Sequence, residues 1–194
     1  MSRSTLNTLL RDVRACRLCE AHLPLGPRPV LRASRTARLL IIGQAPGIRV
    51  HETGIPWNDP SGDRLRDWMQ IDRERFYDEQ TVAIVPMGFC YPGKGKSGDM
   101  PPRQECAAHW HSQLLAAMPA IELTLLVGKY AQNHYLGSQR QSLADTVRHR
   151  AEHAPGFFPL PHPSPRNLRW FREHPWFEQE VLPAFRKRIA AILG

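Results

Sequence analysis

The sequence predicts an α/β fold, a three-layer α/β/α sandwich around a central, mostly parallel sheet of four strands. Short, continuous apolar runs recur along the chain, as expected for strands that are buried on both faces. Segments with helical patterning separate these runs, and that alternation is typical of a parallel sheet covered by helices on both sides. At 194 residues, 42% of them hydrophobic and 23% charged, the chain is long enough to bury such a core as a single domain over residues 1–194.

The expected elements follow one another along the chain. A short amphipathic helix comes first, at residues 6–15. The expected strands are residues 38–43, 81–85, 123–128 and 156–160. The other expected helices are residues 64–69, 103–118, 130–135 and 177–193. The helix at 64–69 follows Ser61, Gly62 and Asp63, residue types that favour a helix start.

The charge balance is positive, with 26 Lys and Arg against 18 Asp and Glu and a formal net charge of +8. Such a balance favours a polyanionic partner, although many basic domains simply carry a solvated surface. No apolar run approaches the ~20 residues of a transmembrane helix, and the first residues lack the apolar core of a secretory signal. We therefore expect a cytoplasmic protein with no membrane partner.

The four cysteines suggest a ligand-binding set. Two of them, Cys16 and Cys19, are close in sequence, while Cys90 and Cys106 follow much later. In a reducing compartment disulfides are disfavoured, so metal or cluster ligation is the leading interpretation. Four thiolates suit either tetrahedral zinc or an iron–sulfur cluster, and spacing alone does not choose between them. The alternative is that Cys90 and Cys106 are small buried hydrophobic residues.

Three expected strands end in unusual loops, and the loops of an open α/β sheet converge on one crevice. We therefore expect Gln44, Cys90 and His162, one from each loop, to be neighbours. The first loop is tight and presents backbone N–H groups to a ligand, unless it is an ordinary turn. Its residues are Gly43, Gln44, Ala45, Pro46 and Gly47.

A second segment joins an aromatic, an amide and a carboxylate in Trp57, Asn58 and Asp59. Trp57 can offer a flat face to a nucleobase, since such stacking is worth ~1–3 kcal/mol, or it can pack in the core. Asp59 can orient a water molecule or stabilise positive charge on a sugar. Its alternative role is that of a turn-forming residue before the helix.

Prolines stiffen residues 161–165 around His162 and Ser164. A neutral imidazole held rigidly can donate a hydrogen bond to an oxygen that gains negative charge. Cations then alternate with aromatics over residues 166–172, which suits phosphate contacts and a wedge into a base stack. A helix with a solvated basic face is the alternative. The candidate DNA contacts are Arg166, Asn167, Arg169 and Trp170.

These motifs occur in one order, and together they make the chain resemble the uracil-DNA glycosylase superfamily, within it the iron–sulfur-containing, family 4-like branch. They are the Cys16/Cys19 pair, the loop 43–47, Cys90 with Cys106, and His-Pro-Ser-Pro at 162–165. The resemblance implies that the four cysteines hold a structural [4Fe–4S] cluster, with zinc the less favoured occupant. It also implies that the loop 43–47 borders the scissile bond and holds the attacking water, with Asn58 and Ser164 also against the substrate.

Some positions depart from the family pattern. The iron–sulfur branch commonly has Glu where this chain has Gln44, and an amide cannot act as a base. A neighbouring branch places a carboxylate shortly after the stacking aromatic, which points to Asp59 as the replacement. Trp57 stands where the family stacks a Phe on the base. Pro86 stands where the family reads uracil with an Asn, and it offers neither an amide nor a backbone donor.

The resemblance implies a monofunctional DNA glycosylase of base excision repair. It would act as a monomer on DNA and hydrolyse the N-glycosidic bond of a flipped-out uracil or other deaminated base. His162 would donate a hydrogen bond to the base O2. Asp59, with Gln44 beside it, would orient the attacking water and offset the positive charge on the sugar. The departures at Gln44 and Pro86 favour an alternative, a catalytically weak or inactive damaged-DNA-binding protein. A third possibility is an enzyme of free nucleotides or nucleosides, against which the basic segment 166–172 argues.

Overall fold

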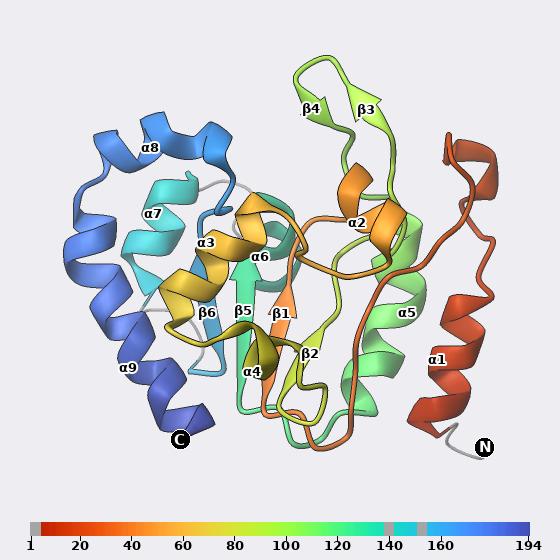
Figure 1. The fold of residues 1–194 in the computed structure, drawn as a ribbon, viewed down its shortest axis with the longest axis horizontal. Helices are drawn as coiled ribbons and strands as arrows, with labels where there is room; N and C mark the ends of the chain where they lie inside the picture. The colour runs from red at the N-terminus through yellow and green to blue at the C-terminus, as the bar shows by residue number, and fades with distance from the viewer. Residues whose placement is uncertain (1–4, 138–141, 151–154) are drawn as a thin grey trace.

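The computed structural model describes residues 5–137, 142–150 and 155–194. Its centre is a sheet of strands β1 (Leu39–Ile42), β2 (Val82–Ile84), β5 (Leu123–Val127) and β6 (Phe157–Leu160). Neighbouring strands are all parallel and lie in the order β2-β1-β5-β6 (Figure 1). The predicted four-stranded sheet is confirmed, and each strand lies within the range predicted for it.

Helices flank this sheet. They are α1 (Leu6–Arg14), α2 (Ile48–Thr53), α3 (Pro60–Met69), α4 (Arg73–Tyr77), α5 (Gln104–Ala116), α6 (Lys129–Leu136), α7 (Leu143–Arg148), α8 (Leu168–Glu173) and α9 (Leu182–Leu193). A π-helical turn, Phe177–Val181, leads into α9. Short 3₁₀ turns occur at Glu20–His22 and Pro165–Asn167.

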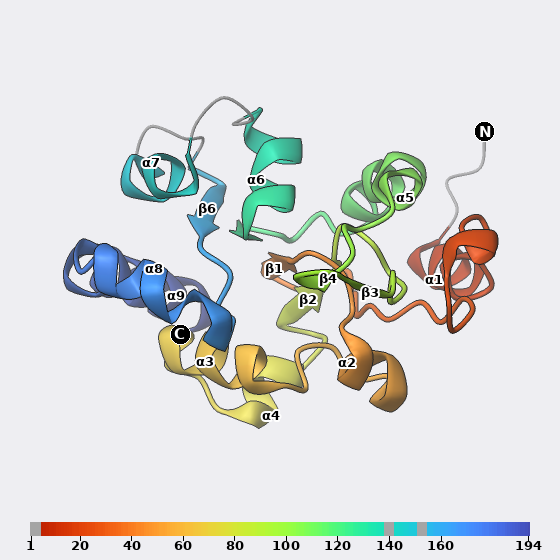
Figure 2. The ribbon, with the colours of Figure 1, turned by 90° about the horizontal axis from the view of Figure 1, so that it is seen from above.

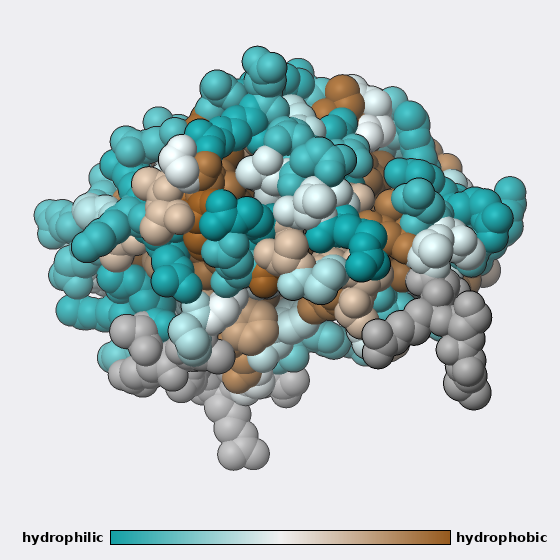
Figure 3. Space-filling model, turned by 90° about the horizontal axis from the view of Figure 1, so that it is seen from below, coloured by the Kyte–Doolittle hydropathy of each residue, from teal (hydrophilic) through white to brown (hydrophobic). Residues whose placement is uncertain are grey.

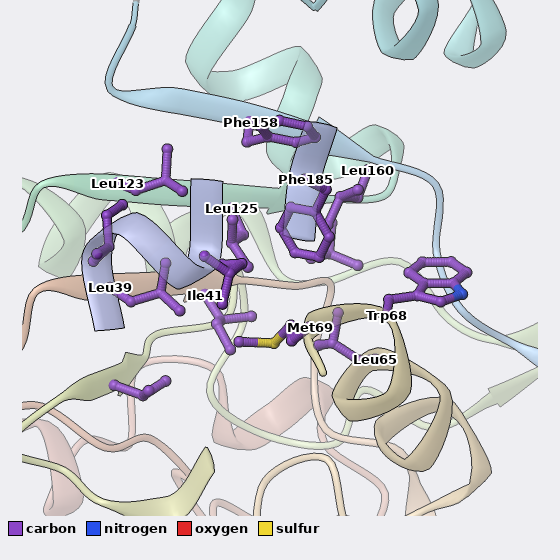
Figure 4. Packing of buried hydrophobic residues seen from close by; sticks show 14 of the residues in the cluster. Leu39, Ile41, Leu65, Trp68, Met69, Leu123, Leu125, Phe158, Leu160 and Phe185 are labelled. Carbon is purple, nitrogen blue, oxygen red and sulfur yellow. The ribbon is translucent and has the colours of Figure 1, made fainter. Parts of the chain in front are cut away.

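The two faces of the sheet contribute to two hydrophobic clusters. Leu39 and Ile41 belong to the cluster with α3 and α9, whereas Leu40 and Ile42 belong to the cluster with α1, α5 and α6. Figure 2 shows helices on both sides of the strands, and Figure 4 shows the first cluster filled by side chains of the sheet, α3 and α9. Because both faces are covered, every residue of β1 is buried, which is why the strand is apolar throughout.

Several helix bounds differ from the prediction. The helix expected at 64–69 begins at Pro60, because the Asp59 side chain caps it and proline fits the first helical position. Helices α2, α4 and α7 were not predicted, because they have too few turns for a hydrophobic period to show, and a helix at α8 was considered only as an alternative. The antiparallel hairpin of β3 (Lys94–Gly95) and β4 (Gly98–Asp99) was not predicted either, because its strands of two residues carry no apolar pattern.

In the sheet, β2 lies on one side of β1, whereas β5 and then β6 lie on the other side, so the strand order changes direction between β1 and β5. In such sheets ligands bind beyond the carboxyl ends of the strands at this change of direction. The hairpin β3–β4 rises above the same edge (Figure 1). The end of the molecule opposite the hairpin has a mainly hydrophilic surface that is interrupted by hydrophobic patches (Figure 3). Within the described ranges, no helix has the length and apolar character needed to cross a bilayer.

Candidate active site

A pocket with about 430 Å³ of empty space lies at the carboxyl ends of β1 and β2, and we call it the strand-end pocket. It brings together side chains from three separate loops, Gln44, Trp57, Asp59 and His162, as the sequence predicted. The rest of its lining is mostly apolar. Those residues are Val30, Gly43, Ala45, Pro46, Gly47, Val50, Pro56, Ile84 and Pro86.

Trp57 forms a fixed wall of this pocket. Its indole ring lies against Gly43, where an added Cβ would be 2.7 Å from the Trp57 Cζ2. Its carbonyl lies against Gly62, where an added Cβ would be only 1.8 Å from the oxygen. Trp57 has a φ of 57°, a strained value for a bulky residue, and the Arg66 guanidinium donates to its carbonyl at 3.3 Å. Trp57 also packs against the core, which is the alternative role considered for it, while its ring lines the strand-end pocket.

His162 faces Trp57 across the pocket. The two ring centroids are 5.5 Å apart and the planes are inclined by 31°. The Asn167 side-chain amide donates to the His162 carbonyl at 2.8 Å, and Gly128 lies beside the imidazole. Burial lowers the pKa of His162, and the nearby Asp59 carboxylate opposes that shift. Because the lowered pKa favours the neutral ring at pH 7, His162 can serve as a neutral hydrogen-bond donor.

Asp59 has a structural role as well as a place in the pocket. Its Oδ1 accepts a hydrogen bond from the Gly62 N–H at 2.8 Å and caps α3. The neighbouring Asn58 instead accepts from Arg73 at 2.9 Å. The described residues that line the strand-end pocket do not include Asn58.

A wider groove opens from the strand-end pocket and has about 1570 Å³ of empty space. Gln44, Asp59 and His162 lie where the two meet. The predicted residues Ser164, Arg166 and Asn167 line the groove. Its remaining lining comes from the first loop, Ser61, the hairpin β3–β4 and the segment from Val127 to Tyr130, with Leu143 beside them.

The groove also contains Asp99, which the sequence analysis missed. This carboxylate ends β4, and a Cβ added to Gly47 would lie 3.4 Å from its Oδ2. Arg166 reaches the same hairpin, because its Nη1 would be 2.5 Å from a Cβ on Gly98. The only sequence signal was a pair of glycines around Lys96 and Ser97, which indicates a tight turn but not where the turn points.

A family model described as the uracil DNA glycosylase superfamily matches residues 32–186. The chain belongs to this superfamily. The matched residues include all four strands of the sheet, the first loop, Trp57, Asp59 and His162. They also include Cys90 and Cys106, but Cys16 and Cys19 precede the match.

In this superfamily member, Arg169 and Trp170 of α8 both make contacts within the protein. Arg169 pairs with Glu173 at 2.7 Å on the exposed side of the helix. Trp170 stacks on His174, with ring centroids 4.4 Å apart, and packs against the core. Neither Arg169 nor Trp170 is among the described residues lining the groove, and the same holds for the neighbouring Leu168, which is 48% exposed. The alternative of a helix with a solvated basic face describes α8 better than a Trp170 wedge.

The four cysteines line a second pocket, the cysteine pocket. Cys90 lies here and not in the strand-end pocket, so the predicted grouping of Cys90 with Gln44 and His162 was wrong. Burial raises the pKa of Cys90 to about 11 and that of Cys106 to about 12. The Phe89 N–H donates to the Cys106 sulfur at 3.4 Å. Burial therefore favours the neutral thiol form of both side chains.

The cysteines share the lining of this pocket with Arg103 and apolar residues. Among the described residues, no group of three or more His, Cys, Asp or Glu side chains is arranged to hold a metal ion. A single zinc ion would require four sulfurs about 2.3 Å from one point.

The loop from Pro86 to Cys90 connects the two pockets, because Pro86 lines the first and Cys90 the second. A buried histidine holds its start. The Pro86 carbonyl is 3.0 Å from Nε2 of His111, and Nδ1 of that ring is 2.6 Å from the Tyr135 hydroxyl. Since a carbonyl only accepts, Nε2 carries the proton and Tyr135 donates to Nδ1.

Proposed function

We propose that the protein is a monofunctional DNA glycosylase that hydrolyses the N-glycosidic bond of uracil, or another deaminated base, flipped out of DNA. One observation carries the proposal: Trp57, Asp59 and His162 line a single pocket that opens into a groove containing Arg166. Superfamily membership supports it. The reaction takes a base out of the stack, because the bond at C1′ is inaccessible within a duplex.

His162 stabilises the leaving base in this proposal. As the bond breaks, negative charge accumulates on the base O2, and a neutral imidazole donates a hydrogen bond to it. The lowered pKa of His162 suits this role, since the ring stays neutral at physiological pH. Removing one donor to a developing oxyanion typically lowers the rate by ~10²–10³-fold.

The sugar becomes positively charged as the base leaves. Asp59 lies in the same pocket, and its negative charge stabilises that positive charge. Trp57 offers its ring to the extruded base, while Arg166 and Ser164 face the groove where the DNA backbone would run. The exposed Leu168 takes the place of Trp170 as the side chain suited to fill the gap in the base stack.

The test is single-turnover excision from an oligonucleotide that contains one uracil, with alkaline cleavage of the abasic product. His162→Ala and Asp59→Asn are expected to lower the rate at least tenfold. Asn is chosen at position 59 because it caps a helix as well as Asp does and removes only the charge. Undiminished excision by both variants would refute the assigned roles.

A second candidate function, a damaged-DNA-binding protein with little or no turnover, is favoured by Gln44 and Pro86. The family resemblance leads us to expect a carboxylate at the position of Gln44 and a base-reading amide at the position of Pro86, and neither group is present there. The single-turnover assay distinguishes the two candidates. Tight binding of the uracil oligonucleotide with no abasic product would support the binding protein.

We further propose that Cys16, Cys19, Cys90 and Cys106 hold a [4Fe–4S] cluster, as in the iron–sulfur branch. Their shared pocket and the hydrogen bond from Phe89 to a sulfur support this assignment. The cluster would be structural, tying the N-terminal arm to the loop that ends at Cys90. Purified protein is expected to be brown and to contain iron. Cys106→Ser should lose both properties, and Ser112→Ala on the same helix should keep them. Stoichiometric zinc without iron would overturn the proposal.

A further inference from the structure

The hairpin β3–β4 brings a second carboxylate to the reaction side of the groove. Asp99 and Asp59 both line it, together with His162. Gly47 shows where the Asp99 carboxylate lies, because the Asp99 Oδ2 is 3.4 Å from the position that a Cβ on Gly47 would take. Asp99 therefore faces the end of the loop that follows β1, where Gln44 supplies no carboxylate.

Contacts on both sides of Asp99 fix this arrangement. The Gln44 side-chain amide donates to the Met100 carbonyl at 3.3 Å, so the first loop holds the residue that follows Asp99. The Met100 N–H donates to the Gly93 carbonyl at 2.8 Å and closes the hairpin. Gly98 has a φ of 141°, which only glycine adopts readily. Gln44 thus serves as a tether for the hairpin, a role for which an amide is well suited.

Asp59 is less available as a proton acceptor than Asp99. The Asp59 Oδ1 already accepts the Gly62 N–H as the cap of α3. Asp99 has no such structural duty in β4, and it stands on the side of the groove formed by the hairpin. A division of work between the two carboxylates follows, in which one stays charged beside the sugar and the other accepts a proton.

We propose that Asp99 is the general base of the glycosylase reaction, an inference that rests on the proposed function. As the water oxygen bonds to C1′, the Asp99 carboxylate takes a proton from that water. The C1′–N1 bond breaks, and its electron pair stays on the uracil, whose O2 accepts a hydrogen bond from His162. The proton on Asp99 then passes to solvent, which restores the carboxylate.

The groups around Asp99 influence how readily it takes up a proton. Although Asp99 is exposed, desolvation by the groups around it and the like charge of Asp59 raise its pKa, while Arg166 and Lys94 oppose this shift. Burial raises the pKa of the Tyr91 phenol, and the negative charge of Asp99 adds to this shift. A base with a raised pKa accepts a proton more readily, and its rate rises with pH until the carboxylate is fully ionised.

The experiment compares wild type, Asp99→Asn and Asp67→Asn, whose position is exposed on α3, in single-turnover excision of uracil from pH 4.5 to 8. Asp99→Asn is expected to lower the excision rate by ~10²–10⁴-fold. It should also remove the part of the fall in rate at low pH that protonation of Asp99 causes. Asp67→Asn should match wild type. Affinity for an uncleavable 2′-fluoro-deoxyuridine oligonucleotide should be unchanged in both variants, because the base acts only on water.

Chemical rescue separates a base from a merely structural residue. Added formate is expected to restore part of the activity of Asp99→Ala and to leave Asp67→Asn unaffected. Wild-type excision by Asp99→Asn, or a loss without rescue and without a change in the pH profile, would overturn the inference and leave the proposed function standing. A wild type that releases no base from any deaminated substrate would overturn both.

Discussion

The buried imidazole of His111 makes the stability of the fold depend on pH. The side chain is only 2% exposed, and both ring nitrogens are engaged, one with the Pro86 carbonyl and the other with the Tyr135 hydroxyl. Burial lowers the pKa of His111 from 6.5 to about 4. A proton on the ring would break the bond from Tyr135 and place an unpaired charge in the core.

The size of the effect follows from the two pKa values. The unfolded chain takes up the proton below about pH 6.5, whereas the folded protein resists it until about pH 4. Between these values the unfolded state binds more protons, so stability falls as the pH falls, and it is retained above pH 6.5. From pH 7 to pH 5, His111 alone should lower the free energy of unfolding by about 2 kcal/mol.

Urea denaturation of wild type and His111→Gln at pH 7 and pH 5 measures this contribution. Gln still offers a donor to Pro86 but has no titrating group. The variant should be less stable than wild type at pH 7, and the gap between them should narrow by about 2 kcal/mol at pH 5. All other titrating groups are shared and cancel in the comparison. An equal loss of stability in both proteins would refute the assigned protonation state.

Two further predictions concern the site. Gly43→Ala places a Cβ 2.7 Å from Trp57 Cζ2, so the indole must shift. Single-turnover kinetics should show excision falling by up to ~10²-fold. Thermal unfolding should show little change in the melting temperature. Arg166→Ala should reduce the slope of log K against log salt by about 1 in DNA-binding titrations, whereas Arg169→Ala, whose guanidinium pairs with Glu173, should have a smaller effect.

The sheet was predictable because its strands are buried on both faces. All four residues of β1 and all five of β5 are buried, and this gives the continuous apolar runs that the sequence displays. The convergence of Gln44 with His162 was predictable for the same reason, since parallel strands end at one edge. The sequence does not say how far each loop reaches, and Cys90 therefore falls in a different pocket.

Side chains whose position depends on tertiary contacts were less predictable. Trp170 and His174 are four residues apart and stack on one face of α8. That helical spacing was visible in the sequence, but the alternation of cations and aromatics drew attention to DNA contacts. Asp99 was not predictable at all, because its place in the groove results from a tether to Gln44 and a glycine turn that no periodicity reveals.

In the proposed reaction, Pro86 would limit how finely the strand-end pocket distinguishes one base from another. It lies in an otherwise apolar wall with Val30, Val50 and Ile84, it has no N–H, and its carbonyl is already bound by His111. A site that hydrogen-bonds its substrate rejects the wrong one by ~10⁴–10⁵-fold, whereas an apolar wall that reads shape discriminates by only ~10–200-fold. We therefore expect this pocket to select bases by shape and to discriminate between them by only ~10–200-fold.

Matched oligonucleotides that carry uracil, xanthine or hypoxanthine opposite the same base test this reasoning. Their single-turnover excision rates should differ by no more than ~200-fold, because shape and stacking on Trp57 decide which base enters. Pro86→Asn adds an amide to the wall and should widen the difference in favour of uracil. A wild-type preference for uracil of ~10⁴-fold or more would show that another group, such as the backbone of the first loop, supplies the reading hydrogen bonds.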